Sequence, residues 1–252
     1  MKLDKLTSFL DDYLKIADFS GDVSNNGLQV SGKDEVKCAV FGVDACQILF
    51  DRAAELDADF IFVHHGLSWG AFPKRFTGIE SARFGTLFRE RMSLYAAHLP
   101  LDAHKISGNN AQIAKMLNLK NIEDFCIYSG YFIGCAGNLA KATEAALIAE
   151  KCHNLFPDAE ISLLGSAPVK KIAIVSGGGG MDAVAQAYQS GADMLITGEL
   201  THTMYHPALE YNLPVLALGH YASETTGPKA MMDVVAAEFG IDCHFIDIPT
   251  GL

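Results

Sequence analysis

Short apolar runs alternate with amphipathic stretches along most of the chain. The runs have the length of buried strands, and the stretches repeat apolar residues at the spacing of a helix face. In the first half, this pattern predicts strands at 37–44, 59–65 and 93–98 and helices at 46–56, 80–91 and 110–117. In the second half, it predicts strands at 171–176, 194–197, 214–220 and 245–248 and helices at 182–189, 205–211 and 226–239. Such alternation is typical of an α/β protein with mainly parallel sheets.

The two halves resemble each other. Residues 58–62 (ADFIF) align with residues 192–196 (ADMLI), and the next strand of each half ends in His-x-x-x-carboxylate. Two βαβ units can resemble each other by composition alone, but this matching strand end favours an internal duplication. We therefore predict two related α/β lobes, residues 1–125 and 126–252. Residues 121–164 fit neither repeat and are interpreted as a linker with its own helix near 142–152.

Polar side chains follow several predicted strands, where parallel α/β proteins carry their functional groups. An apolar run ends in His64 and His65. Adjacent side chains on a strand point to opposite faces, so both imidazoles can serve one site only if the backbone turns, which Gly66 permits. The alternative is one core histidine and one surface histidine.

Two further clusters have the form His-x-x-x-carboxylate. In the first, His98 to Asp102, Pro100 argues against a helix, so we predict an extended stretch with His98 and Asp102 on one polar face. The alternative is a loop with a capping aspartate. In the second, His220 to Glu224, the glutamate lies near the start of the last helix. There it could bind a metal or only interact favourably with the helix dipole.

Together these clusters predict a metal centre. Imidazoles and carboxylates are ligands suited to Zn, Fe, Mn or Ni. The set is larger than one tetrahedral ion needs, and two ions about 3.5–4 Å apart would use it and hold an activated water between them. The predicted ligands are His64, His65, Asp102, His220 and Glu224.

Two softer features accompany these clusters. The loop Ser176 to Gly180 follows a strand and precedes a helix, so its amides could cradle an anion such as phosphate. It lacks the residues of a P-loop, and a plain turn is an equal alternative. Glu199 occupies the repeat position of His65; it is either a supporting or acid–base group of the site or a solvated loop glutamate.

Composition narrows the class of protein. Of 252 residues half are hydrophobic, which is enough for a sizeable core. The chain begins without the pattern of a signal peptide and has no apolar run of about 18 residues, so we expect a soluble cytoplasmic protein. The formal net charge is −11 and the basic residues are scattered, which argues against nucleic acid as a main partner. The six cysteines form no C-x-x-C pair and are interpreted as reduced core residues.

The motifs resemble those of the GTP cyclohydrolase I type 2 homologues, also called Nif-three-like or YbgI-type dinuclear-metal proteins. The resemblance covers nearly the whole chain, and its landmarks are residues 26–30 (NGLQV), 63–66 (VHHG), 98–102 (HLPLD), 176–179 (SGGG), 197–199 (TGE) and 219–224 (GHYASE). It implies two lobes around a two-metal site and a toroidal homohexamer. It assigns the five ligands named above, with Glu224 as a bridge between the ions, and leaves His98 as a further ligand or a supporting group. Family members with a large domain inserted between the lobes differ from this chain, whose middle stretch is too short for one.

Two functional hypotheses follow. The first is a metal-dependent hydrolase acting on a small molecule, with opening of the guanine ring of GTP and release of formate as the specific case. In it, His98 or Glu199 would transfer protons. The second is a metal-binding or regulatory ring-shaped assembly without turnover, whose metals would be enclosed by protein ligands. A DNA-associated role for such a ring is disfavoured by the acid excess.

Overall fold

The computed structural model describes residues 1–71 and 75–252, which form two compact units. Unit 1 consists of Met1–Leu101 and Pro228–Ile248, and unit 2 consists of Asp102–Gly227 and Pro249–Leu252. Each unit has its own sheet, so the predicted α/β class is confirmed. The units differ from the predicted halves, because position 125 lies inside strand β5 (Lys120–Tyr128) and the last strand pairs with the sheet of unit 1. Among the described residues, no helix combines the length and the apolarity needed to cross a membrane.

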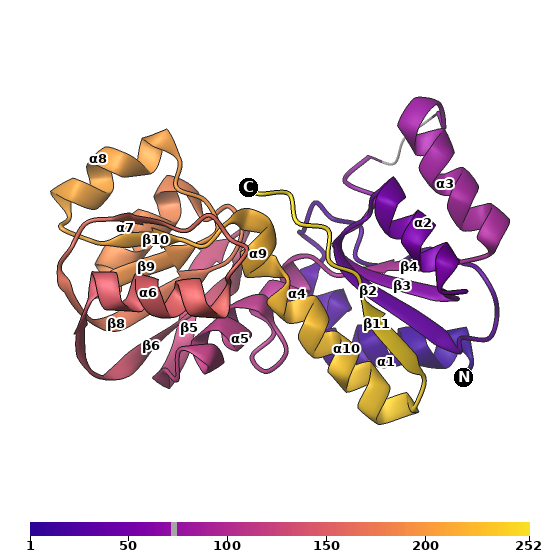
Figure 1. Ribbon diagram of the computed structural model, residues 1–252, viewed down its shortest axis with the longest axis horizontal. Helices are drawn as coiled ribbons and strands as arrows, with labels where there is room; N and C mark the ends of the chain where they lie inside the picture. The colour runs from indigo at the N-terminus through magenta and orange to yellow at the C-terminus, as the bar shows by residue number, and fades with distance from the viewer. Residues whose placement is uncertain (72–74) are drawn as a thin grey trace. The chain divides into compact units, whose positions relative to one another are not determined.

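The sheet of unit 1 has the order β1-β4-β3-β2-β11. Figure 1 labels β2, β3, β4 and β11 of this sheet. Its strands are β1 (Gly27–Val30), β2 (Cys38–Asp44), β3 (Phe60–His65), β4 (Ser93–Ala96) and β11 (Asp242–Phe245). All neighbours are parallel except β1 and β4. Strand β11 begins earlier than the predicted strand 245–248, because Asp242 lies opposite Cys38 in the ladder. The apolar residues beyond it, Ile246 and Ile248, pack against the core instead of extending the strand.

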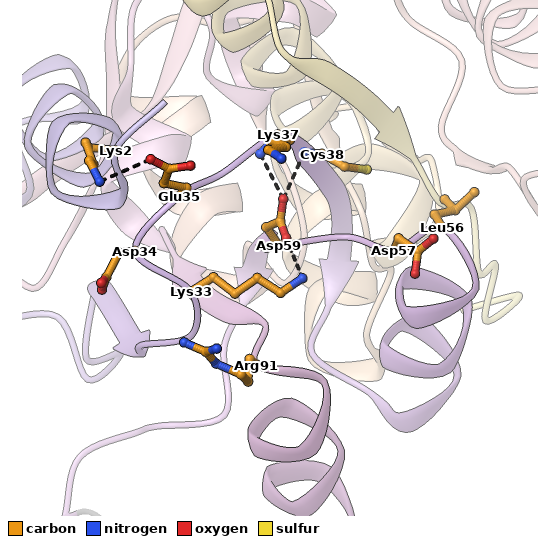
Figure 2. Close-up of a pocket in the computed structure, with 10 residues that line it drawn as sticks. All are labelled: Lys2, Lys33, Asp34, Glu35, Lys37, Cys38, Leu56, Asp57, Asp59 and Arg91. Atoms are coloured by element: carbon orange, nitrogen blue, oxygen red, sulfur yellow. Dashed lines mark hydrogen bonds and ion pairs between the residues drawn. The ribbon is translucent and has the colours of Figure 1, made fainter.

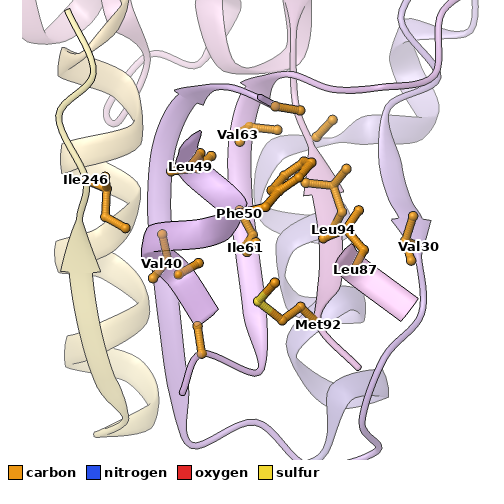
Figure 3. Packing of buried hydrophobic residues seen from close by; sticks show 14 of the residues in the cluster. Val30, Val40, Leu49, Phe50, Ile61, Val63, Leu87, Met92, Leu94 and Ile246 are labelled. Atoms are coloured by element: carbon orange, nitrogen blue, oxygen red, sulfur yellow. The ribbon is translucent and has the colours of Figure 1, made fainter. Parts of the chain in front are cut away.

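Helices cover both faces of this sheet, so its strands are nearly continuous apolar runs. On one face lie α2 (Gln47–Glu55) and α3 (Gly78–Glu90). They contribute Phe50 and Leu87 to the core, where Met92, which follows α3, is also buried (Figure 3). On the other face, α1 (Leu3–Leu14) and α10 (Thr226–Phe239) pack through leucines, Met231 and Val235 onto Phe41 and Phe62. A short 3-10 helix, η1 (Ile16–Phe19), follows α1.

The sheet of unit 2 has the order β5-β6-β8-β9-β10-β7. Its other strands are β6 (Tyr131–Glu144), β7 (Ser162–Leu164), β8 (Pro168–Val175), β9 (Met194–Thr197) and β10 (Val215–Ala217). Strands β8, β9 and β10 are parallel, and the remaining neighbours are antiparallel. The helices are α5 (Asn109–Met116), α6 (Ala145–Leu155), α7 (Gly180–Gln189) and α8 (His202–Glu210).

The interpretation of residues 121–164 as a linker is wrong, although its predicted helix is present as α6. The stretch forms the hairpin of β5 and β6, then α6 and β7. Ser129 and Gly130 connect the hairpin strands with φ angles of 49° and 87°. Two consecutive positive φ angles match the right-handed twist of the flanking strands, which makes this two-residue turn a favourable hairpin connection.

A short helix follows the third parallel strand of each repeat. These helices are α4 (Leu99–Ala103) after β4 and α9 (His220–Glu224) after β10. The predicted extended stretch from His98 to Asp102 is therefore wrong. Pro100 lies in the first turn of α4, where its missing N–H needs no helical partner. Asp22 Oδ2 accepts the N–H of Leu99 at 3.1 Å. This hydrogen bond satisfies one of the backbone N–H groups at the start of the helix that have no helical partner.

A repeated carboxylate contact is consistent with the duplication that we predict. Asp59, just before β3, accepts the backbone N–H groups of Lys37 at 2.8 Å and Cys38 at 3.3 Å. Asp193, just before β9, accepts those of Lys170 at 2.9 Å and Lys171 at 2.8 Å. Each aspartate thus holds the beginning of the neighbouring parallel strand in its own unit.

Candidate metal centre

Three histidines of unit 1 form a cluster, which we call the histidine cluster: His64, His65 and His98. His64 and His65 end strand β3, and His98 directly precedes α4. One ring nitrogen from each lies within 4.8 Å of the others. The imidazole centroids are 4.6 Å apart for His64 and His65 and 5.2 Å apart for His64 and His98. The structure thus brings together three of the predicted site residues in this unit.

Gly66 serves this cluster differently from our prediction. Strand β3 continues through His65, and Gly66 does not have the positive φ of a left-handed turn. A Cβ at this position would lie 2.4 Å from Oε1 of Gln29. That oxygen accepts the backbone N–H groups of Leu67 at 2.8 Å and Ser68 at 3.0 Å. Gly66 therefore leaves room for the glutamine that orders the loop after the two histidines.

Each imidazole of the histidine cluster directs Nδ1 at an acceptor. Nδ1 of His64 lies 2.9 Å from the carbonyl oxygen of Ala97, and Nδ1 of His65 lies 2.8 Å from Oδ1 of Asp44. Nδ1 of His98 lies 3.0 Å from Oδ1 of Asp22. These acceptors favour the tautomer with the proton on Nδ1, which directs the lone pair of Nε2 toward a metal ion.

Asp22 anchors the third histidine. Burial by itself raises the pKa of Asp22, but hydrogen bonds from His98, Asn26 and the backbone of Ser24 outweigh it and lower the pKa to about 2. Asn26 also accepts the backbone N–H of His98 at 2.8 Å. The segment from Asn26 to Val30 thus supports the histidine cluster without supplying a ligand. The indole ring of Trp69 lies 5.0 Å from the ring of His98.

A second group of ionisable side chains lies in unit 2, and we call it the His220–Glu224 cluster: His220, Glu224 and Glu199. His220 and Glu224 are one helical turn apart on α9, with Nε2 3.2 Å from Oε2. Nδ1 of His220 lies 2.6 Å from Oε1 of Glu199. Hydrogen bonding to Glu224, opposed by burial and helped by the charges of both glutamates, raises the pKa of His220 to about 9. Glu199 thus holds His220 as Asp44 holds His65.

Asp102 occupies a separate position in unit 2. Its Oδ1 accepts hydrogen bonds from Nδ2 of Asn109 at 2.8 Å and from the hydroxyl of Ser176 at 3.1 Å. The residue is 8% exposed. Within unit 2, it forms no group of three possible metal ligands among the described residues. Two donors therefore keep this buried carboxylate in place.

The loop from Ser176 to Gly180 forms one wall of the His220–Glu224 cluster. The backbone N–H groups of Ser176, Gly177 and Gly179 are donated to Asn110, Ser223 and Thr197, respectively. Because these amides already have acceptors, the predicted anion cradle is not supported at them. Gly177 has a φ of +62°, and a Cβ there would lie 2.2 Å from Oε1 of Glu224. The glycine is needed to make room for the carboxylate.

The donor set of the two clusters fits a divalent transition metal. It contains imidazole nitrogens and carboxylate oxygens and no thiol, which suits Zn, Fe, Mn or Ni. His64 is fully buried and Glu224 is 3% exposed. The surrounding protein therefore fixes the positions of both side chains, unlike those of mobile surface groups. Sequence reasoning missed Asp22, Asp44 and Asn109. Only Asp44 carried a signal, because it ends a predicted strand.

The fold and these clusters define an α/β protein of two units with candidate metal ligands after its parallel strands. The chain belongs to the Duf34/NIF3 (NGG1p interacting factor 3) family, whose model matches residues 1–251. It is 45% identical to a protein of Archaeoglobus fulgidus named GTP cyclohydrolase 1 type 2 homolog, over all of both chains. The family resemblance seen in the motifs is thereby confirmed.

Solved structures of relatives share the fold. TTHA1606 from Thermus thermophilus is 37% identical, with a TM-score of 0.91 and full coverage of both chains. The protein ybgI, of unknown function, is 33% identical, with a TM-score of 0.92 and full coverage of both chains.

Proposed function

We propose that this protein binds two divalent metal ions per chain and uses them for hydrolysis. The proposed ligands are His64 and His65 in unit 1 and Asp102, His220 and Glu224 in unit 2. The supporting observation is the shared arrangement of four imidazoles: Nδ1 of His64, His65, His98 and His220 each lies within 3.0 Å of a carbonyl or carboxylate oxygen. Imidazoles that bind metals through Nε2 have this arrangement.

The remaining side chains position the ligands or transfer protons. His98 is placed like a ligand, because its ring nitrogen lies within 4.8 Å of those of His64 and His65. Glu199 orients His220 through Nδ1, and its carboxylate is 44% exposed. That exposure lets Glu199 exchange protons with solvent, which suits a general acid or base. We therefore propose Glu199 as a catalytic side chain, and His98 either as a further ligand or as the second catalytic side chain.

Bound divalent ions would supply a water of lowered pKa and polarise the bond that is attacked. The protein's own side chains then hold the site in shape. Asn109 and Ser176 fix the carboxylate of Asp102, and Gly177 leaves room for Glu224. Such preorganisation is what places reacting groups within reach of each other.

We propose a nucleotide as substrate, with GTP as the specific case. The support is the name GTP cyclohydrolase 1 type 2 homolog carried by the relatives. In that reaction one water adds at C8 of guanine and the first bond from C8 to a ring nitrogen breaks, which leaves a formyl group on the other nitrogen. A second water cleaves that remaining bond, C8 leaves as formate, and each freed nitrogen takes up a proton. The amides of Ser176, Gly177 and Gly179 are already engaged, so triphosphate binding is proposed elsewhere than at this loop.

The test loads metal-free protein with iron, manganese or zinc and measures bound metal and formate release from GTP. We expect at least two ions per chain and formate release that is lost in Glu224→Gln. Asp12→Asn is the control, because Asp12 is exposed and remote in sequence from every proposed ligand. Absence of bound metal contradicts the whole proposal. Tight binding of two ions without turnover of any nucleotide supports the alternative of a non-catalytic metal-binding or regulatory protein.

We also propose the toroidal homohexamer that the family resemblance implies. The support is the number of large apolar side chains exposed on the hairpin of unit 2, each about half exposed: Ile122, Ile127, Tyr128 and Phe132. Exposed apolar groups gathered on one element are typical of an interface. Light scattering should give six times the 27.1 kDa chain mass, and Phe132→Lys should lower it. A monomeric wild-type protein contradicts this proposal.

A further inference from the structure

A second group of possible metal ligands lies in unit 1, apart from the histidine cluster. It consists of Cys38 on β2 and Asp242 and His244 on β11, and one ligand atom from each lies within 4.8 Å of the others. We call it the edge triad, because β11 is the edge strand of the sheet. We propose that the edge triad is a site for one thiophilic divalent ion such as Zn²⁺, in addition to the ions of the proposed metal centre.

The strand register builds this triad. In the parallel ladder of β2 and β11, Asp242 lies opposite Cys38 and His244 lies opposite Val40. Side chains alternate along a strand, so Asp242 and His244 share the face on which Cys38 and Val40 point. Cys38 and Val40 both belong to the core cluster on that face, whereas Cys243 packs against the cluster on the opposite face. A thiol, a carboxylate and an imidazole therefore meet at the edge of the hydrophobic core on this face of the sheet.

The electrostatic surroundings favour a cation. Burial raises the pKa of the Cys38 thiol, and the carboxylates of Asp242, Asp59 and Asp57 raise it further. Asp59 is already paired with Lys33 at 2.7 Å. Asp242 is paired with His244, whose Nε2 lies 2.9 Å from Oδ2. A divalent ion would take the place of the proton shared by His244 and Asp242 and would displace the proton of the thiol.

Access to Cys38 comes from an open pocket. The pocket has a volume of about 780 Å³ and is lined by Cys38 together with Lys33, Asp57, Asp59 and Arg91, among others. Figure 2 shows Cys38 at one side of it, next to Asp59 and near Asp57. His244 is 39% exposed, so the triad can be reached from solvent as well.

The ligand types select the ion. A thiolate, an imidazole and a carboxylate form a mixed set that binds Zn²⁺ or Co²⁺ in tetrahedral geometry, with a water in the fourth position. Mg²⁺ and Ca²⁺ prefer oxygen ligands and would bind this set poorly. The ions of the proposed metal centre have only nitrogen and oxygen donors, so sulfur ligation distinguishes the edge triad from that centre.

The test titrates the full metal-free chain with Co²⁺ and follows the near-ultraviolet charge-transfer band of cobalt bound to thiolate. We expect the amplitude of the band at saturation to correspond to one thiolate-bound Co²⁺ per chain, and the band to disappear when Zn²⁺ is added. Cys38→Ser should abolish it. His244→Gln should weaken binding by at least the roughly 10–100-fold seen when even a supporting partner of a metal ligand is lost.

Cys243→Ser is the matched control, because Cys243 lies on the same strand pair but faces the other side of the sheet. It should leave the band unchanged. If Cys38→Ser does not fold, His244→Gln carries the test, because His244 is partly exposed and its substitution should leave the circular dichroism spectrum unchanged. The proposal is overturned if no such band forms or if the band depends on Cys243 and persists in His244→Gln. Failure of the proposed metal centre would not produce either result, since that centre contains no sulfur.

Discussion

Oδ1 of Asp44 lies 2.8 Å from Nδ1 of His65, and the same two residues face each other in the parallel ladder of β2 and β3. The backbone register therefore sets the distance between the carboxylate and the imidazole. A ring held in this way loses little rotational freedom when it binds a metal ion, which is the benefit of a preorganised ligand.

Asp44→Asn should weaken metal binding to the histidine cluster. The asparagine keeps the shape of the side chain but loses the negative charge that supports the imidazole, and loss of such partners typically costs about 10–100-fold in affinity. Isothermal titration with Mn²⁺ or Zn²⁺ measures the change. Asp12→Asn serves as the charge-matched control. Equal affinities in the two variants would show that Asp44 has no role in metal binding.

Gly177→Ala should disrupt the His220–Glu224 cluster far more than Gly180→Ala. The two glycines have nearly the same φ, +62° and +63°. Both substitutions should therefore incur the same backbone strain, about 1–2 kcal/mol. Only at Gly177 does the new Cβ meet Oε1 of Glu224, whereas at Gly180 no other atom of the described residues lies within 4 Å of it.

Bound metal measured by elemental analysis, together with unfolding midpoints, separates the two effects of these substitutions. The clash predicts that Gly177→Ala loses metal and that Gly180→Ala loses only stability. Equal metal content in both proteins would rule out a steric role for Gly177.

The fluorescence of Trp69 should report metal binding. It is the single tryptophan of the chain, and its ring lies 5.0 Å from His98 and 6.0 Å from His65. A paramagnetic ion such as Co²⁺ or Ni²⁺ at the histidine cluster should quench its emission, and a chelator should restore it. His98→Asn, which removes the nearest imidazole, should shift the quenching to higher metal concentration. Unquenched emission at saturating metal would place the bound ion away from this cluster.

Protonation of Asp59 should make unit 1 less stable in acid. Burial raises the pKa of Asp59, but hydrogen bonds from Lys33, Lys37 and Cys38 outweigh it, and the pKa lies below its ordinary value. A carboxylate whose pKa is lowered by folding contributes stability above its unfolded pKa and loses it as pH falls through the folded value. The contribution should thus be complete at neutral pH and disappear below about pH 4.

Urea unfolding followed by Trp69 fluorescence tests this in unit 1, the unit that contains both residues. Asp59→Asn should be destabilised by about 1–3 kcal/mol at neutral pH, because it leaves donors without their charged acceptor. The difference from wild type should shrink as pH falls toward 3. A difference independent of pH would show that the charge of Asp59 is not what stabilises the strand start.

Hydrophobic periodicity predicted most of the parallel strands and their helices, because residues buried on both sides form continuous apolar runs there. It missed β5, whose residues are mostly exposed, and β6, whose few buried residues lie between exposed and partly buried ones and so form no long apolar run. It also mistook residues 98–102 for an extended stretch. The rule that proline breaks helices does not hold in a first turn, and sequence alone does not show where a five-residue helix begins.

The ligand types of the candidate site could be predicted from the strand ends, because imidazoles and carboxylates recur there, where parallel α/β proteins carry their functional groups. The partners of those ligands could not. Asp22 reaches His98 across a sequence separation of 76 residues, and nothing near Asp22 marks it. Glu199 was found only because its place in the repeat corresponds to that of His65.

Unit 1 is assembled from two separate segments of the polypeptide, and this bears on the order of events during translation. Strand β11 and the part of α10 that packs beneath the sheet emerge from the ribosome after the whole of residues 102–227. Unit 2 is nearly contiguous in the nascent chain and can reach its native contacts earlier. Until the last segment arrives, β2 has an open edge, and such an edge can pair with another chain.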